Sequence, residues 1–321
     1  MTVLSYAGAS DTGRKRRRNE DSYVIAPPLF AVADGMGGAQ AGEIASRLAA
    51  AALEDTDPGS MSGPERVESL IQEANRRVHE RAIADPSTSG MGTTMTVALV
   101  EGRNVTFGHV GDSRAYRYRD GEIEQITEDH SLVNELLKSG KLSPEEAGTH
   151  PQRSVITRAV GTDPDVDVDS FTLEAEVGDV FLICSDGLTD MVDDEDIRSV
   201  LDKFRNDLDR ATKSLVSAAN RGGGEDNITV VAFEISEDGG ETARMPMVEE
   251  DTMENVAAPK VDTMVVPPER VEQVFVEPGS PEAAAVTRRE PISPAARVRL
   301  VLAMLLLLSV AAVLLVWGLV R

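Results

Sequence analysis

The chain carries a long uncharged, strongly apolar segment that limits how it can fold. Residues 300–320 contain no charged side chain over 21 positions, which as a helix would be about 31 Å long. This length matches the hydrocarbon core of a bilayer, and a helix that is apolar on every side is typical of a membrane span. We therefore predict a transmembrane helix at 300–320. A helix buried in a protein core is the alternative.

The basic residues around this segment predict its orientation. Four arginines precede it and one follows it: Arg288, Arg289, Arg297, Arg299 and Arg321. Because basic residues concentrate on the cytoplasmic side of a span, the part of the chain before it is expected in the cytoplasm. The first ten residues, MTVLSYAGAS, show no apolar signal-peptide region. We expect a single-pass protein of the cell membrane.

The part before the span divides into a globular region and a linker. Residues 237–299 are acidic, contain several prolines and lack sustained periodicity, which indicates a flexible linker. A small second domain is the alternative, because residues 265–278 could form a short strand or docking segment. The predicted domains are therefore 3–236, 237–299 and 300–320.

The net charge lies mainly in the globular region. The 321 residues include 55 Asp and Glu against 32 Lys and Arg, a formal charge of −23, of which −18 falls in residues 1–236. Phosphate-backbone binding depends on Lys and Arg, so this balance argues against a general nucleic-acid binder. The single Cys excludes an internal disulfide framework and a cysteine-rich zinc site.

Residues 1–236 mix strand and helix patterns. Apolar or alternating runs predict strands at 29–34, 94–100, 104–110, 181–186 and 228–235, and Asp120-Gly121 predicts a hairpin turn within 114–127. Helical periodicity covers 42–54, 63–84, 130–139, 194–204 and 207–220. Consecutive hairpins with few crossovers favour an α+β fold of antiparallel sheets flanked by helices, not a doubly wound parallel sheet.

Carboxylates beside glycines follow or precede several of these strands. They occur in Asp34-Gly35, Ser185-Asp186-Gly187 and Gly224-Glu225-Asp226, with further acids at Glu20, Asp21 and Asp112. Any one could be a turn residue. Gathered together they would repel one another, so we expect divalent cations among them. Oxygen ligands without His or Cys select Mg²⁺ or Mn²⁺, and two such ions would activate water and clamp a phosphoryl oxygen.

The order of these motifs resembles a known family. The motifs are Arg16-x-x-x-Glu20-Asp21, Asp34-Gly35-x-Gly37-Gly38, Gly92-Thr93-Thr94, Gly111-Asp112-Ser113-Arg114, Ser185-Asp186-Gly187-Leu188-x-Asp190 and Asp226-Asn227-Ile228-Thr229. Over residues 3–236 the chain is similar to the metal-dependent protein phosphatases, or protein phosphatase 2C, in particular the bacterial branch that acts opposite membrane Ser/Thr kinases. The resemblance implies a four-layer sandwich of two antiparallel sheets flanked by helices.

The resemblance also implies an activity and the roles of individual residues. It implies hydrolysis of phosphoserine and phosphothreonine by direct attack of a water that bridges two Mn²⁺ or Mg²⁺ ions. Asp34 would bridge the ions, the Gly35 carbonyl would bind one of them, and Asp186 and Asp226 would bind the other. Asp112, with Asp186, would hold a third, weaker ion, and Glu20 and Asp21 would hold ion-bound waters. Arg16 would bind the phosphate, with Arg17 as the alternative register.

Other residues are expected to have ordinary roles. Met36 stands where eukaryotic relatives place a proposed acid, and a thioether cannot donate a proton, so the leaving-group acid is not assigned. His130 and His150 fall in a segment that resembles the family's mobile flap. His109 and Cys184 are expected in the core, and no P-loop or complete dinucleotide-binding motif occurs.

The expected partners are phosphoproteins, including a membrane Ser/Thr kinase, and the chain is expected to be a monomer. Two rival functions follow from the same features. One is a catalytically silent module that holds a partner at the membrane, although no aspartate of the predicted metal set is missing. The other is a phosphatase dedicated to an anti-sigma-factor antagonist.

Overall fold

The computed structural model describes residues 2–37, 41–55, 61–143, 146–147, 150–152 and 154–236. The chain divides into two units, Met1–Met247 and Val248–Arg321. The predicted linker at 237–299 and the predicted span at 300–320 lie outside the described residues. Within the described ranges, no helix is both long and apolar enough to cross a membrane.

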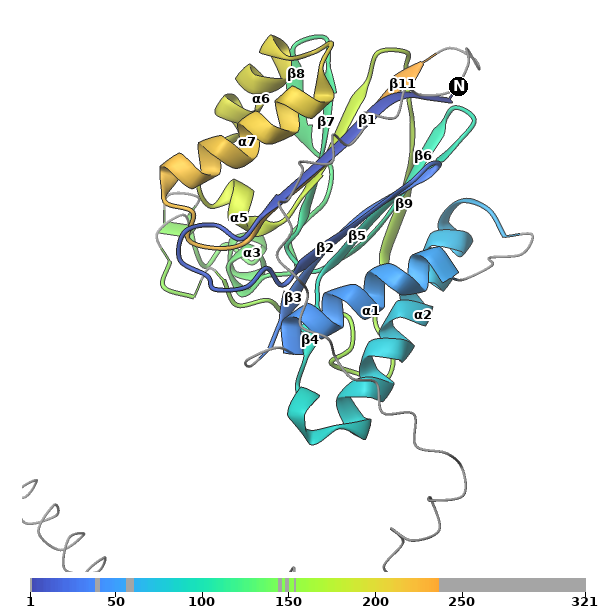
Figure 1. Cartoon of the computed structure of the whole chain (residues 1–321), viewed down its shortest axis with the longest axis vertical. Helices are drawn as coiled ribbons and strands as arrows, with labels where there is room; N and C mark the ends of the chain where they lie inside the picture. Colours follow the sequence, from blue (N-terminus) through green and yellow to red (C-terminus); the bar gives the residue numbers. More distant parts are fainter. Residues whose placement is uncertain are drawn as a thin grey trace, which may run out of the picture. The chain divides into compact units, whose positions relative to one another are not determined.

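Two antiparallel sheets form the middle of the globular region (Figure 1). The first has the strand order β1 (Thr2–Asp11), β11 (Ile228–Ser236), β10 (Val180–Cys184), β7 (Arg114–Arg119) and β8 (Glu122–Gln125). The second has the order β2 (Asp21–Ala26), β3 (Leu29–Met36), β5 (Met95–Glu101), β6 (Asn104–Val110) and β9 (Asp169–Glu174), and the short β4 (Gly92–Thr93) pairs with the end of β3.

Helices cover the outer face of each sheet, so that the fold has four layers. The second sheet is covered by α1 (Ala41–Asp55) and α2 (Gly63–Ala84), and the first by α5 (Asp186–Thr189), α6 (Asp194–Lys203) and α7 (Leu208–Gly222). The remaining elements are α3 (Leu132–Lys138) and a 3-10 turn (Pro86–Thr88). The prediction of antiparallel sheets flanked by helices is confirmed.

Apolar residues from both sheets fill the space between them. Strand alternation sends Phe30 and Val32 of β3 into this inner layer, while Ala31 and Ala33 face the helices. The ring of Phe30 stacks on Phe233 of β11, with centroids 4.3 Å apart. Such a contact joins one sheet directly to the other and fixes how they are aligned.

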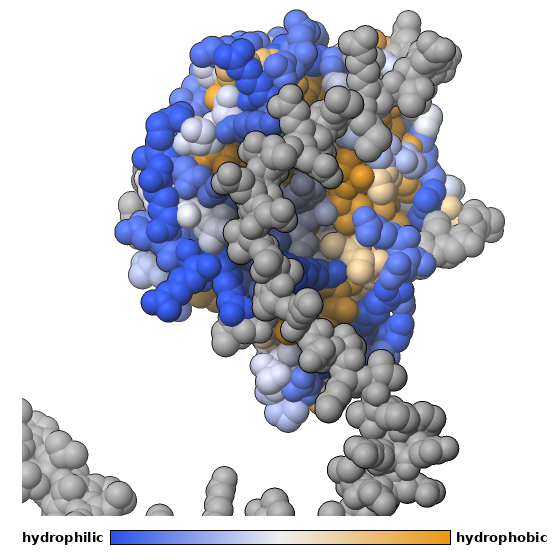
Figure 2. All heavy atoms as spheres, viewed as in Figure 1, coloured by the Kyte–Doolittle hydropathy of each residue, from blue (hydrophilic) through white to orange (hydrophobic). Residues whose placement is uncertain are grey.

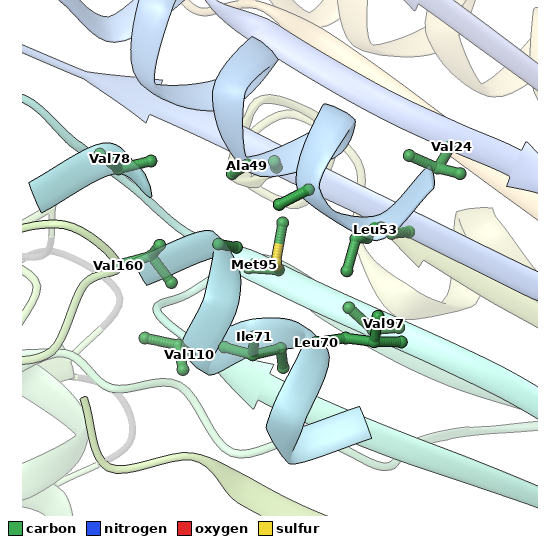
Figure 3. Close-up of a cluster of buried hydrophobic side chains, with 14 of the residues drawn as sticks. Val24, Ala49, Leu53, Leu70, Ile71, Val78, Met95, Val97, Val110 and Val160 are labelled. Carbon is green, nitrogen blue, oxygen red and sulfur yellow. The ribbon is translucent and has the colours of Figure 1, made fainter. Parts of the chain in front are cut away.

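Close packing of helix on sheet uses small residues at the contact points. Figure 3 shows the cluster in which Ala49, Leu70 and Ile71 of α1 and α2 pack on Val97 of the second sheet. A Cβ on Gly108 of β6 would lie 2.3 Å from Val67 Cγ1, so a larger residue there would push α2 away from the sheet. The visible outer surface over α6 and α7 is mostly hydrophilic, as expected for amphipathic helices (Figure 2).

Most of the predicted elements are confirmed, with shifts at their ends. The hairpin turn has positive φ at both Asp120 (51°) and Gly121 (83°), as a type I′ turn requires. The strand predicted at 181–186 is wrong at its end, because β10 stops at Cys184 and Asp186 opens α5. The helix predicted at 130–139 begins only at Leu132, since the Ser131 hydroxyl accepts from the Asn134 amide and caps it.

Candidate active site

Three aspartates lie at the same end of the first sheet, where its inner strands begin or stop. Strands β10 and β11 pair with Cys184 opposite Val230, and β7 pairs with β10 with Arg114 opposite Cys184. Asp186 follows the end of β10, Asp226 precedes β11 and Asp112 precedes β7. Antiparallel neighbours therefore bring carboxylates that are far apart in the sequence to one end of the fold.

The second sheet contributes two more carboxylates at this end. Asp21 of β2 pairs directly with Asp34 of β3. The backbone of Asp34 is fixed by Thr94, because the Asp34 amide donates to Thr94 Oγ1 at 2.9 Å and the Thr94 amide donates to the Asp34 carbonyl at 2.8 Å. The Gly35 amide donates to the Glu20 carbonyl at 3.1 Å, which brings the loop before β2 to the same place.

Burial and mutual repulsion raise the pKa values of four of these carboxyl groups. The pKa of Asp34 is raised well above its ordinary value by burial and then by the charges of Asp21 and Asp186. The pKa of Asp186 is raised in the same way by burial and by Asp112 and Asp226. Burial is also the main cause that raises the pKa values of Asp21 and Asp112 to about 6. The carboxylates from both sheets are thus close enough to affect one another.

Two oxygen atoms in this group fit a cation. Within the described part of the chain, Asp21 Oδ1 and Asp186 Oδ1 are buried and have no hydrogen-bond partner. A buried carboxylate oxygen without a donor is costly unless a cation accompanies it. No three His, Cys, Asp or Glu side chains of the described residues are arranged as a ready set of ligands for one ion. The carboxylates are near one another here, but their oxygens do not converge on a single position that one ion could occupy.

Arg16 forms an ion pair with one of these carboxylates. Its Nη2 donates to Asp226 Oδ2 at 2.6 Å, and the side chains of Arg16 and Asp226 are 53% and 32% exposed. The other oxygen, Asp226 Oδ1, accepts from the Asn227 amide at 2.8 Å. The guanidinium is therefore half-exposed beside the aspartate cluster, where it can reach an anion that enters from solvent.

Asn227 holds the loop that carries Arg16 and Glu20. Its Oδ1 accepts from the Glu20 amide at 2.7 Å, and its Nδ2 donates to the carbonyls of Thr12 and Arg18, each at 2.9 Å. Asn227 has no role predicted from the sequence, although it stands next to Asp226 in the motif. An amide that both donates and accepts can tie two ends of one loop together, which a carboxylate could not do.

Ser185 was also missed as a functional residue. Its hydroxyl donates to Asp21 Oδ2 at 2.9 Å and accepts from the Thr229 amide at 3.0 Å. This contact joins the first sheet to a carboxylate of the second sheet. Its position directly before Asp186 is the only signal that the sequence offered.

Two glycines next to the aspartates allow backbone segments to touch. A Cβ on Gly35 would lie 2.1 Å from the Gly42 carbonyl oxygen, and one on Gly187 would lie 2.0 Å from the Asn227 carbonyl oxygen. Any side chain at either position would force these segments apart. The glycines after Asp34 and Asp186 are thus required by packing, and Gly38 lies outside the described residues.

Two further residues singled out from the sequence lie in the core, and a pocket adjoins the site. Cys184 is fully buried, and burial raises the pKa of its thiol to about 12, so it is a packing residue as expected. His109 is buried in β6, also as expected. A pocket of about 500 Å³ adjoins the aspartates and is lined in part by Asp112, Asp186 and Leu137 of α3.

Comparison with known proteins finds relatives that are named as phosphatases. The sequence model of the protein phosphatase 2C family matches residues 15–219. The chain is 42% identical over 235 residues to the serine/threonine protein phosphatase PstP of Mycobacterium tuberculosis, which covers 73% of this chain and 45% of that protein. It is 38% identical over 236 residues to the serine/threonine phosphatase stp of Listeria monocytogenes, which covers 70% of this chain and 93% of that protein. The chain thus spans about half the length of the PstP relatives.

Solved structures match the same region. A crystal structure of the Mycobacterium tuberculosis phosphatase aligns with a TM-score of 0.69 at 42% identity, covering 73% of this chain and 100% of that one. A catalytic domain of PstP in complex with two manganese ions aligns with a TM-score of 0.68 at 39% identity, covering 74% of this chain and 100% of that one.

The repulsion among the aspartates predicts how ions change stability. At pH 8, Mn²⁺ at a hundred times its Kd should stabilise the fold by about 2.7 kcal/mol. This raises the melting temperature by roughly 5–10 °C in thermal unfolding. The increase should shrink at pH 5.5, because protons compete for carboxyl groups whose pKa values are raised.

Substitution of Asp34 separates this effect from non-specific ion binding. Asp34→Asn removes one repelling charge, so the ion-free melting temperature should rise while the response to Mn²⁺ is lost. Asp165→Asn, at an exposed position, is the matched control and should respond as the wild type does. An equal response to Mn²⁺ in both variants would contradict a cation site at Asp34.

Proposed function

This chain belongs to the protein phosphatase 2C family, and we propose that its residues 3–236 act as a metal-dependent protein serine/threonine phosphatase. The observation that carries the proposal is the group of partly buried, mutually repelling aspartates at one end of both sheets, with a half-exposed arginine beside it. Relatives of the same family named as serine/threonine phosphatases support the substrate class.

We propose that two divalent ions bind among these aspartates. Asp34 would bridge them, the Gly35 carbonyl would bind one, and Asp186 and Asp226 would bind the other. Glu20 and Asp21 would position waters on the ions, and Asp112 with Asp186 would hold a third, weaker ion. The oxygen-only donor set favours Mn²⁺ or Mg²⁺, and the related structure with two manganese ions supports the pair.

The residues of this chain would divide the work of hydrolysis. Bound ions would supply a nucleophile by lowering the pKa of water and would offset charge on the phosphoryl oxygens. Arg16 would bind two phosphoryl oxygens through its planar guanidinium and orient the phosphate for attack on the side away from the leaving serine or threonine oxygen. To do so it would release Asp226, its partner in this structure. Met36 cannot protonate the leaving oxygen, so that proton must come from another group or from water.

Turnover of a phosphopeptide tests the proposed activity directly. The full chain should hydrolyse a phosphothreonine peptide with Mn²⁺, and EDTA or Asp34→Ala should reduce the rate at least 100-fold, because the nucleophile is no longer activated. The measurement is release of inorganic phosphate. Undiminished release in EDTA would refute the metal mechanism, and a folded protein without any turnover would favour the silent binding module.

Arg16 and Arg17 offer a matched pair of variants. Arg16→Ala should lower kcat/KM for a phosphopeptide by roughly 10- to 100-fold, since it removes charge-assisted hydrogen bonds to the phosphate. Arg17→Ala should change kcat/KM less than threefold. Steady-state kinetics on both variants would check this, and the reverse ranking would move the phosphate contact to Arg17.

We also propose that residues 300–320 anchor the phosphatase in the cell membrane and that 237–299 act as a tether. A coil of about 60 residues reaches on the order of 40–50 Å, so catalysis would be confined near the cytoplasmic face. Phosphoproteins there, including a Ser/Thr kinase of the membrane, would be substrates of a monomeric enzyme. A phosphatase dedicated to an anti-sigma-factor antagonist is the second candidate, which a screen of phosphoproteins would separate.

Cell fractionation tests the anchor. The full chain should sediment with membranes and leave them only in detergent, whereas a chain that ends at residue 236 should stay in the supernatant with its peptide turnover intact. Equal distribution of the two forms would contradict the anchor. A full-length variant in which two leucines of 300–320 are changed to arginine provides a length-matched control.

A further inference from the structure

His130, which is outside the proposed ligand set, forms hydrogen bonds to the turn that carries Asp112. The Gly111 amide donates to His130 Nδ1 at 3.0 Å, and the His130 amide donates back to the Gly111 carbonyl at 2.7 Å. His130 is buried, so water does not compete for these bonds. Residue 111 is therefore held by one residue through both its backbone polar groups.

The partners of His130 determine which ring nitrogen carries the proton. Because Nδ1 accepts from Gly111, the proton of a neutral ring lies on Nε2. Nε2 then donates to Asp169 Oδ2 at 3.1 Å. Arg158 Nη1 also lies 3.1 Å from Nε2, and it donates to Asp169 Oδ1 at 2.6 Å. Burial lowers the pKa of His130, which keeps the ring neutral. The imidazole is thus oriented from β9 and presents a fixed acceptor to Gly111.

The turn at 111–113 is constrained from its other side as well. Gly111 has a φ of 110°, and a Cβ there would lie 2.6 Å from Thr94 Cβ, so only glycine fits. Thr94 Oγ1 lies 2.7 Å from Ser113 Oγ. The same threonine hydroxyl accepts from the Asp34 amide. Movement of the turn would therefore change the direction in which the Asp112 carboxylate points.

We propose that His130 is a positioning residue for Asp112, an inference that rests on the proposed role of Asp112 as an ion ligand. His130 fixes Gly111, and Gly111 fixes the backbone from which the carboxylate projects. His130 also accepts from the Thr157 amide through its carbonyl, at 2.8 Å, so the segment before β9 is tied to the same turn. The polar contacts of the imidazole are with Gly111, Asp169 and Arg158, so its proposed effect on Asp112 acts through the backbone.

A double-mutant cycle on the full chain tests this role. His130→Leu removes the acceptor for Gly111 and should weaken Mn²⁺ binding at the Asp112 site by ~10-fold in calorimetric titration, the size seen when residues that orient ligands are lost. In the Asp112→Asn background the same change should have little further effect. His130→Asn, whose Oδ1 can take the place of Nδ1, should retain most of the affinity.

Hydrogen exchange provides a readout that does not depend on ions. The Gly111 amide should be protected in the wild type and in His130→Asn, and should exchange at least 10-fold faster in His130→Leu, while amides of β6 keep their rates. If His130→Leu does not fold, the protection in the wild type and in His130→Asn remains decisive. An unprotected Gly111 amide in the wild type would overturn the inference.

The outcomes distinguish this inference from the proposed function. If the wild type fails to hydrolyse phosphopeptides, the proposed function falls. If hydrolysis is intact but Asp112→Asn leaves Mn²⁺ binding unchanged, the ligand role of Asp112 is refuted and the positioning role with it. If His130→Leu costs the same affinity with and without Asp112, the positioning role alone is refuted. Equal losses would show a general structural effect.

Discussion

Repulsion among partly buried carboxylates is the constraint on which the rest of this structure depends. Asp34 and Asp186 come from different sheets. The charge of Asp186 raises the pKa of Asp34, and the charge of Asp21, from the sheet of Asp34, raises the pKa of Asp186. A fold that gathers such groups loses stability unless something compensates them, here Arg16 on Asp226 and Ser185 on Asp21. Three features keep this unfavourable cluster together. They are the packing of the two sheets, the glycines at close backbone contacts and the loop held by Asn227.

The sequence predicted the centre of the fold better than its edges. Strands β1, β2 and β9 were missed, and all three lie at the edge of a sheet. Edge strands are half-exposed, so their apolar pattern is weak: β2 has one buried residue among six, and β9 has none. The edge strand β8 was found only because Asp120-Gly121 is a strong turn signal. Central strands such as β10 are buried on both faces and read as apolar runs.

Some residues of the candidate site can be predicted from the local sequence pattern, and others only from the tertiary structure. An aspartate before glycine at a strand end is visible in the sequence, so Asp34 and Asp186 could be proposed from it. Asn227 and His130 act through contacts with backbone groups many residues away, 207 residues in the case of Asn227 and Glu20. No local pattern distinguishes such an asparagine from one in an ordinary turn, because the partner is set by the tertiary structure.

The stacked pair of Phe30 and Phe233 has a consequence for how the site could respond to distant change. Each sheet supplies its own share of the aspartates, so the spacing of the site is a property of how two rigid layers are aligned. A small slide of one sheet over the other would move Asp21 and Asp34 together against Asp186 and Asp226. The aromatic layer between the sheets therefore sets the spacing of the carboxylates at their end. The first effect of a substitution deep in this core would be a change in the distances between those carboxylates.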